Sequence, residues 1–275
     1  MTAHYVHVVG SVPLPDAETT FATLGTVLGP YLHSIPDGET GARLDWIRFL
    51  EPVFAENSAF EPTNEEFLVH GNATPMRRYR LRDGVATDDI RLDNLLYADC
   101  ALESWAIFSR LKAEGTIPAH CRFQVDFAPG HSPCRAFIAE DDQAVIELLF
   151  DVGLKREIDR ITAAIPHDQL VIQFDIASAV FFHLERGMPT RYGETKAEMH
   201  AAFAAQVISL GDCVPKGVDL IYHLCYGDNK HKHSIEPTDM LDLVTFTNNV
   251  SAGISRPIQL FHMPVPRDRS DDAYF

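Results

Sequence analysis

The stretch Val218-Asp-Leu-Ile-Tyr-His-Leu-Cys-Tyr-Gly-Asp228 decides the predicted fold, because an apolar run ends there in polar side chains. Its residue types favour a buried β-strand, and His231 and His233 follow soon after it. Side chains alternate between the two faces of a strand, so His223 and Cys225 should point the same way, with Cα atoms roughly 6.6 Å apart. An imidazole and a thiol at that separation can converge on one ion or one substrate atom. The stretch therefore predicts a strand that carries reactive groups at its carboxyl end.

The composition of the 275-residue chain is typical of a globular protein, with 46% hydrophobic and 23% charged residues. Its net charge of −16 argues against a nucleic-acid partner, because binding to a phosphate backbone depends on clustered Lys and Arg. The five cysteines form no C-x-x-C pair, and the sequence shows neither a signal segment nor an apolar run of membrane-spanning length. We therefore predict a cytoplasmic protein that acts on a small molecule and does not bind membranes.

Further buried strands are expected in six other places along the chain. These are His4–Gly10, Tyr31–Ile35, Phe67–His70, Arg122–Ala128, Leu170–Ala177 and Arg256–Met263, and Met76–Leu81 is expected to form part of a hairpin. Helical spacing recurs between them, at residues 17–28, 94–114, 141–165, 194–214 and 237–251. Strands that alternate with helices predict a parallel sheet, and long apolar strands predict that both of its faces are covered.

Seven such strands predict an α/β fold of the TIM (β/α)8-barrel type, with an eighth strand that is atypical or missing from this chain. The barrel would be a single domain over residues 1–275, with an irregular excursion at about 50–90. A doubly wound open sheet is the alternative, although no G-x-G-x-x-G or P-loop motif supports a nucleotide-binding version of it. An unclosed barrel would expose strand edges, which a second copy of the chain could cover in a homo-oligomer.

Polar residues at the carboxyl ends of the strands are the candidates for chemistry, because the active site of a barrel lies there. Gln173 and Asp175 are two residues apart, as are His223 and Cys225, so each pair shares a face of its strand. Polar groups in apolar strands are costly to bury without partners, and their repetition across five strands favours a site. The strand-end candidates are Ser11, Asp37, Glu39, Asp126, His131, Gln173, Asp175, His223, Cys225, Asp228 and His262.

Three short motifs resemble the barrel domain of cobalamin-independent methionine synthase. They are Gly10-Ser11-Val-Pro13, Gln173-Phe-Asp175 and Tyr-His223-Leu-Cys225-Tyr226, in the family's order, and 50 residues separate Gln173 from His223. The resemblance implies the TIM barrel that this family shares with uroporphyrinogen decarboxylase. It also implies a catalytic zinc ion, bound by His223 and Cys225, that activates a thiol for methylation.

The sequence departs from that family in the rest of the zinc site. Asp175 is followed by Ile-Ala-Ser-Ala in place of the family's Glu-Pro-Ala, and no cysteine follows Cys225. The family's set of two cysteines, one histidine and one glutamate therefore cannot be completed by this chain alone. A third ligand would have to come from other side chains, and water could hold an open position. The candidates for it are His262, His231, His233 and Asp228.

Three functions remain open from the sequence. The first is a methyl- or alkyl-transferase acting on a small thiol or organic acid, in which zinc would lower the thiol pKa. In this transferase, Asp175 and Asp126 would orient the substrate or cofactor. A loop with Asp37, Glu39 and Arg43 would close over a charged group. The other predicted substrate contacts are Ser11, Gln173 and Tyr226. The second is a metal-free lyase, decarboxylase or hydrolase, in which His223 or His262 pairs with Asp175 or Asp228 as general acid and base. The third is a barrel that binds a small molecule without catalysis.

Overall fold

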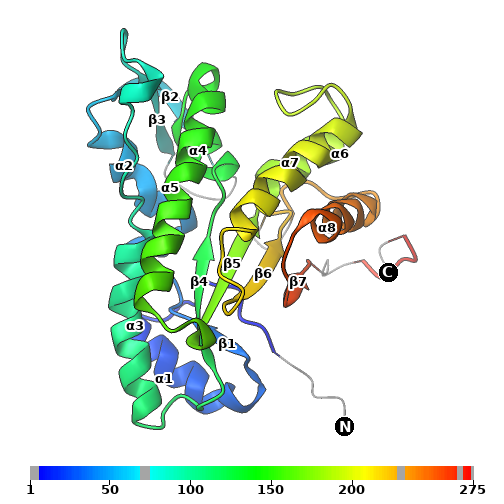
Figure 1. Ribbon diagram of the computed structural model, residues 1–275. Helices are drawn as coiled ribbons and strands as arrows, with labels where there is room; N and C mark the ends of the chain where they lie inside the picture. The colour runs from blue at the N-terminus through cyan, green and yellow to red at the C-terminus, as the bar shows by residue number, and fades with distance from the viewer. Residues whose placement is uncertain (1–5, 69–74, 228–232, 265–268, 274–275) are drawn as a thin grey trace.

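A five-stranded parallel sheet in the order β1-β4-β5-β6-β7 forms the centre of the protein (Figure 1). The structure is a computed structural model that describes residues 6–68, 75–227, 233–264 and 269–273. The sheet consists of β1 (Ser34–Pro36), β4 (Arg122–Phe127), β5 (Leu170–Ile176), β6 (Asp219–Leu224) and β7 (Leu260–His262). A second, antiparallel sheet pairs β2 (Phe60–Phe67) with β3 (Met76–Leu81).

The longer helices alternate with the strands and pack against one another in sequence order (Figure 1). Contacts run from α1 (Ala17–Val27) to α3 (Tyr97–Ala113), then to α5 (Gln143–Ala164), α7 (Lys196–Gly211) and α8 (Leu241–Gly253). Three shorter helices are α2 (Glu51–Ala55), α4 (His131–Phe137) and α6 (Ser178–Arg186). Local sequence sets where α7 begins, because Thr195 and Glu198 form a reciprocal capping box at its first turn.

One face of the sheet is apolar and packs against the helices. Phe127, Phe174, Tyr222 and Phe261 lie side by side in register on four neighbouring strands, with ring centroids 5.5 to 5.9 Å apart. The Tyr222 hydroxyl donates a hydrogen bond to the Val207 carbonyl of α7 at 3.0 Å. A buried aromatic row of this kind anchors the helix layer through both apolar contact and a satisfied polar group.

The opposite face carries the polar residues, because side chains alternate along each strand. Gln124 on β4 and Gln173 on β5 point away from the aromatic row and bind the N-terminal segment. Gln124 Nε2 donates to the Val8 carbonyl at 3.0 Å, and Gln173 Nε2 donates to the Val9 carbonyl at 2.6 Å. The segment that precedes Gly10 therefore lies against the polar face of the sheet.

The predicted TIM (β/α)8-type barrel is wrong, although the α/β arrangement with a parallel sheet is confirmed. The sheet is an open half-barrel of five strands. Within the described part of the predicted strand His4–Gly10, only Val6 pairs with the sheet, through one bridge to Leu32. The following residues bind the glutamine side chains instead. The predicted strand Phe67–His70 lies partly outside the described residues, and Phe67 ends β2 of the antiparallel pair rather than joining the parallel sheet.

The strands predicted from long apolar runs are confirmed, and β3 has the predicted bounds. The region at 50–90 contains α2 and the antiparallel pair, and β3 contacts α4 through a bridge between Tyr79 and Ile138. Within the ranges that the structure describes, no helix has both the length and the apolar character needed to cross a bilayer.

Candidate functional site

A cavity of about 430 Å³ lies at the carboxyl ends of β5 and β6, and we call it the acid cavity. Five of the predicted site residues line it together: Ser11, Glu39, Asp175, His223 and Cys225. They come from the N-terminal segment, the loop after β1, and the ends of two neighbouring strands. The register of the sheet explains part of this convergence, because Asp175 lies opposite His223 across β5 and β6.

Glu39 is held at the cavity by the loop that follows β1. Its backbone N–H donates to Asp37 Oδ1 at 3.0 Å, and its side chain accepts a short hydrogen bond from the Ser11 hydroxyl. Asp37 also accepts from the Ser104 hydroxyl at 2.7 Å and forms an ion pair with Arg43. The predicted loop acids and arginine are thus brought together, but Asp37 and Arg43 lie behind Glu39 rather than in the cavity wall.

Two residues of the cavity wall have strained backbones. Glu39 has a φ of 47° and Trp46 a φ of 55°, both in the left-handed region that side chains other than glycine rarely adopt. Gly38, between Asp37 and Glu39, has a φ of 81°, and a Cβ there would lie 2.9 Å from Thr20 atoms. Strained residues of this kind persist only where surrounding contacts hold them, and they concentrate at functional sites.

Three buried carboxyl groups lie close together at this site: Glu39, Asp126 and Asp175. Burial raises the pKa of Glu39. Burial, together with the charges of Asp175 and Glu39, raises the pKa of Asp126 well above its ordinary value. Burial and the charge of Glu39 do the same to the pKa of Asp175. Several carboxyl groups in one buried site cannot all ionise, because their negative charges repel one another. Some of them therefore keep a proton at a pH where an exposed carboxyl group is ionised.

Glycine at position 10 allows this clustering. A Cβ at Gly10 would lie 3.1 Å from Asp126 Oδ2 and 3.5 Å from Glu39 Oε2. Asp126 itself accepts from Gln124 Nε2 at 2.9 Å, and Asp175 accepts from Gln173 Nε2 at 2.8 Å. The two glutamines therefore hold one carboxylate oxygen each while they also hold the N-terminal segment.

The histidines on this face are neutral at physiological pH. His223 Nδ1 lies 2.8 Å from His262 Nδ1, and the ring of His7 lies 5.3 Å from that of His262. Burial lowers the pKa of His223 to about 3 and that of His7 to about 4, and it also lowers the pKa of His262. His262 thus lies behind His223 and does not line the acid cavity.

The predicted zinc ligands His223 and Cys225 both line the acid cavity. Cys225 Sγ accepts from the Gly227 N–H at 3.0 Å, and His223 turns its Nδ1 toward His262. Within residues 6–68, 75–227, 233–264 and 269–273, no three side chains of the His, Cys, Asp and Glu types are placed to hold a metal ion. The described residues therefore supply at most two ligands, and Asp228 and His231, two of the predicted third ligands, lie outside them.

The remaining predicted residues have structural partners. Gln173 is fully buried and also accepts from His7 Nε2 at 2.8 Å. Tyr226 is fully buried, and its hydroxyl donates to Glu185 at 2.9 Å. His131 lines a different cavity, on α4. Neither Gln173 nor Tyr226 lines the acid cavity, so the substrate contacts of these two side chains stay a prediction.

Several lining residues were not predicted, among them Trp46, Arg48 and Ser178. Ser178 lies two residues beyond the end of β5, so its position after a strand could have identified it. The Trp46 side chain hydrogen-bonds to Asp175. Trp46 and Arg48 lie in a 3-10 helix, residues 46–50, and no periodic sequence pattern indicates that this segment covers the cavity.

No model of a known protein family matches this chain, and no curated protein matches it. The likeness to methionine synthase therefore stays a prediction that rests on its three short motifs.

Proposed function

We propose that the protein is an enzyme that transforms a small molecule in the acid cavity by general acid–base catalysis. One observation carries the proposal: two carboxyl groups with raised pKa, Glu39 and Asp175, line the same cavity. Perturbed acids that line a cavity are typical of catalytic sites, because a proton donor at neutral pH must keep its proton there. The strained backbones of Glu39 and Trp46 support the same proposal.

The roles follow from the contacts of each group. Asp175 receives hydrogen bonds from Gln173 and Trp46, which fix its orientation toward the cavity. In its protonated form it would donate to a leaving group or to a developing carbanion. Glu39, bound by the Ser11 hydroxyl, would exchange the second proton of the reaction. This chemistry belongs to the lyase, decarboxylase and hydrolase classes, in which proton transfer by positioned carboxyls contributes roughly 10²- to 10⁴-fold in rate.

The experiment compares the wild-type protein with Asp175→Asn on a mixture of small metabolites. Each protein is incubated with the mixture, and mass spectrometry follows which compounds are consumed and which appear. We expect a compound that the wild type converts and Asp175→Asn does not. Asp168→Asn, at an exposed position far from the cavity, is the matched control and should convert it normally. Equal conversion by Asp175→Asn would refute the proposed role, and a wild type inactive on every compound would count against catalysis.

The thiol transferase with zinc is the second candidate, because His223 and Cys225 do line one cavity. Its test is the zinc content of the reduced, full-length protein by mass spectrometry of the metal. One zinc per chain that disappears in both His223→Ala and Cys225→Ala would support it. A wild-type protein that binds no zinc when zinc is supplied in excess would contradict it.

A further inference from the structure

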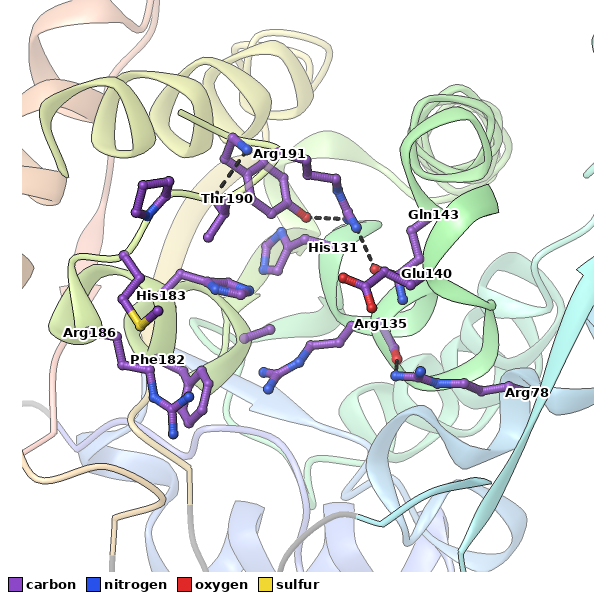
Figure 2. Close-up of a pocket in the computed structure, with 14 residues that line it drawn as sticks. Arg78, His131, Arg135, Glu140, Gln143, Phe182, His183, Arg186, Thr190 and Arg191 are labelled. Carbon is purple, nitrogen blue, oxygen red and sulfur yellow. Dashed lines mark hydrogen bonds between the residues drawn. The ribbon is translucent and has the colours of Figure 1, made fainter. Parts of the chain in front are cut away.

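A second cavity of about 430 Å³ lies between α4 and α6 and has four arginines in its wall (Figure 2). We call it the arginine pocket; its basic residues are Arg78, Arg135, Arg186, Arg191, His131 and His183. Glu140 is the one carboxylate among the described residues that line it. The chain as a whole has a net charge of −16, so this local concentration of positive charge is opposite in sign to the rest of the protein.

Arg135 lies at the centre of this charge. Its guanidinium stacks on the rings of Phe67 and Phe182, 5.6 and 4.9 Å from their centroids. In the part of the chain that the structure describes, its guanidinium has no ion pair or hydrogen bond. Burial and the neighbouring charge of Arg78 lower its pKa. A half-buried cation surrounded by cations is unfavourable until an anion neutralises it.

The neighbouring arginines differ in how far they are neutralised. Arg191 forms hydrogen bonds or ion pairs with Gln143, Glu147 and Tyr192, so its orientation is fixed by the protein. Arg186 stacks on the Phe182 ring at 4.0 Å, and no described acid pairs with it. Arg186 and Arg135 therefore contact the same aromatic ring, near which Figure 2 draws both, and both line the arginine pocket.

Two histidines complete the pocket. His131 is 2% exposed, and its Nε2 has no hydrogen-bond partner among the described residues. Its Nδ1 lies 3.1 Å from Gln206 Oε1. Burial, followed by the charges of Arg135 and Arg191, lowers the pKa of His183 to about 4. A bound anion would favour the protonated form of both rings, and His131 Nε2 could then donate to it.

A smaller cavity of about 80 Å³ lies beside both this pocket and the acid cavity. It shares Arg135 and Phe182 with the arginine pocket, and it shares Trp46 and Ser178 with the acid cavity. The shared residues place the three cavities side by side, an arrangement that an elongated molecule with one anionic end would suit.

We propose that the arginine pocket binds the phosphate or carboxylate group of a small molecule whose other end reaches the acid cavity. The second half of this statement rests on the proposed function, and the first half does not. Phosphate and carboxylate match the flat, forked donor geometry of guanidinium better than any other common ligand group. The pocket thus selects substrates with an anionic end, and the acid cavity receives the end that reacts.

Titration with inorganic phosphate, followed by calorimetry and by the NMR signals of the histidine rings, tests the anion site. We expect saturable binding to the wild-type protein and a rise in the pKa of His183. Arg135→Gln should weaken phosphate binding at least tenfold, and Arg186→Gln should weaken it by a smaller factor. Arg110→Gln, an exposed arginine that pairs with Glu18 and Glu114, is the control and should bind phosphate normally.

A parallel titration with acetate distinguishes a phosphate ligand from a carboxylate ligand. Tighter binding of phosphate than of acetate indicates a phosphate ester, and the reverse order indicates a carboxylate. The anion site is refuted if neither probe binds saturably. It is also refuted if Arg135→Gln and Arg186→Gln, both folded by circular dichroism, bind the probes as the wild type does.

The substrate of the metabolite experiment tests the link between the two cavities. It should carry a phosphate or carboxylate group, and Arg135→Gln should raise its KM at least tenfold with little change in kcat. An unchanged KM refutes the link while the proposed function stands. Phosphate binding without any conversion of metabolites refutes the proposed function and leaves the anion site established.

Discussion

The acid cavity and the arginine pocket have the same volume, about 430 Å³, yet their charges respond to burial in opposite ways. In the acid cavity burial raises the pKa of Glu39 and Asp175 and keeps protons on them. In the arginine pocket burial lowers the pKa of His183 to about 4, whereas the arginines keep their charge at any physiological pH. The first cavity is therefore suited to exchange protons, and the second to hold a permanent negative charge.

The two cavities also differ in what builds them. The acid cavity is formed at the carboxyl ends of β5 and β6 and by the loop after β1, whereas α4, α6 and the residues after α6 form much of the arginine pocket. Strand ends are fixed by the hydrogen bonds of a sheet, so they can hold reacting groups within narrow limits. Side chains on short helices and loops are better suited to recognise one end of a ligand.

The largest expected effect is on turnover. Asp175→Asn keeps the size of the side chain and an oxygen that can accept from Gln173, but it removes the exchangeable proton. We expect kcat for the substrate to fall by about 10²- to 10⁴-fold, the contribution typical of a general acid. Steady-state kinetics measures it, and a change in KM alone would place Asp175 in binding rather than in proton transfer.

The second effect is on stability at high pH. The pKa of Glu39 is higher in the folded state, so the stability it contributes is complete below its unfolded pKa and is lost as the pH rises through its folded pKa. Glu39→Gln removes this loss. We expect its Tm to exceed that of the wild type by about 2–4 °C at pH 8, roughly the shift for 1 kcal/mol in a domain of this size.

Differential scanning calorimetry at pH 4 and pH 8 checks this expectation. The advantage of Glu39→Gln should shrink at pH 4, where the carboxyl is protonated in both states of the chain. A variant that gains equally at both pH values would show that packing, and not the proton, accounts for the change.

The third effect is expected in the arginine pocket and has the opposite sign. The pKa of His183 is lower in the folded state, so its contribution to stability is complete above pH 6.5 and is lost as the pH falls toward 4. His183→Gln should lose less stability than the wild type between these pH values. Urea unfolding at pH 7 and at pH 4.5 measures the free energy of unfolding of each protein. His120→Gln, at an exposed position, is the control. An equal loss in both variants would refute this effect of burial.

The sequence was a good guide to the strands and to part of the acid cavity. The apolar runs at β4, β5 and β6 predicted strands because both faces of the sheet are covered, and alternation predicted that His223 and Cys225 share a side. The carboxyl end of a strand likewise identified Asp175, which lies near the end of β5, and Glu39, which lies in the loop after β1. These inferences use short-range geometry, which a sequence contains directly.

The sequence did not predict how the sheet ends or where the second cavity lies. Residues 6–10 are β-branched and apolar enough for a strand, but the amides of Gln124 and Gln173 bind their carbonyls and hold them off the sheet. The arginines come together only after α4 and α6 fold, and both are short helices that lie outside the predicted helical stretches. Contacts between segments distant in the sequence determine both where the sheet ends and where the arginine pocket lies. A local sequence pattern does not indicate such contacts.

The hydrogen bonds from Gln124 and Gln173 to the carbonyls of Val8 and Val9 couple the N-terminal segment to the carboxyl groups of the acid cavity. Gly10 and Ser11 follow the held residues directly and touch the carboxyl cluster, so tension on the N-terminus would be transmitted to Glu39. We therefore expect a partner fused ahead of these residues to disturb the hydrogen bond between Ser11 and Glu39. Protein engineers should attach tags to this molecule at its other terminus.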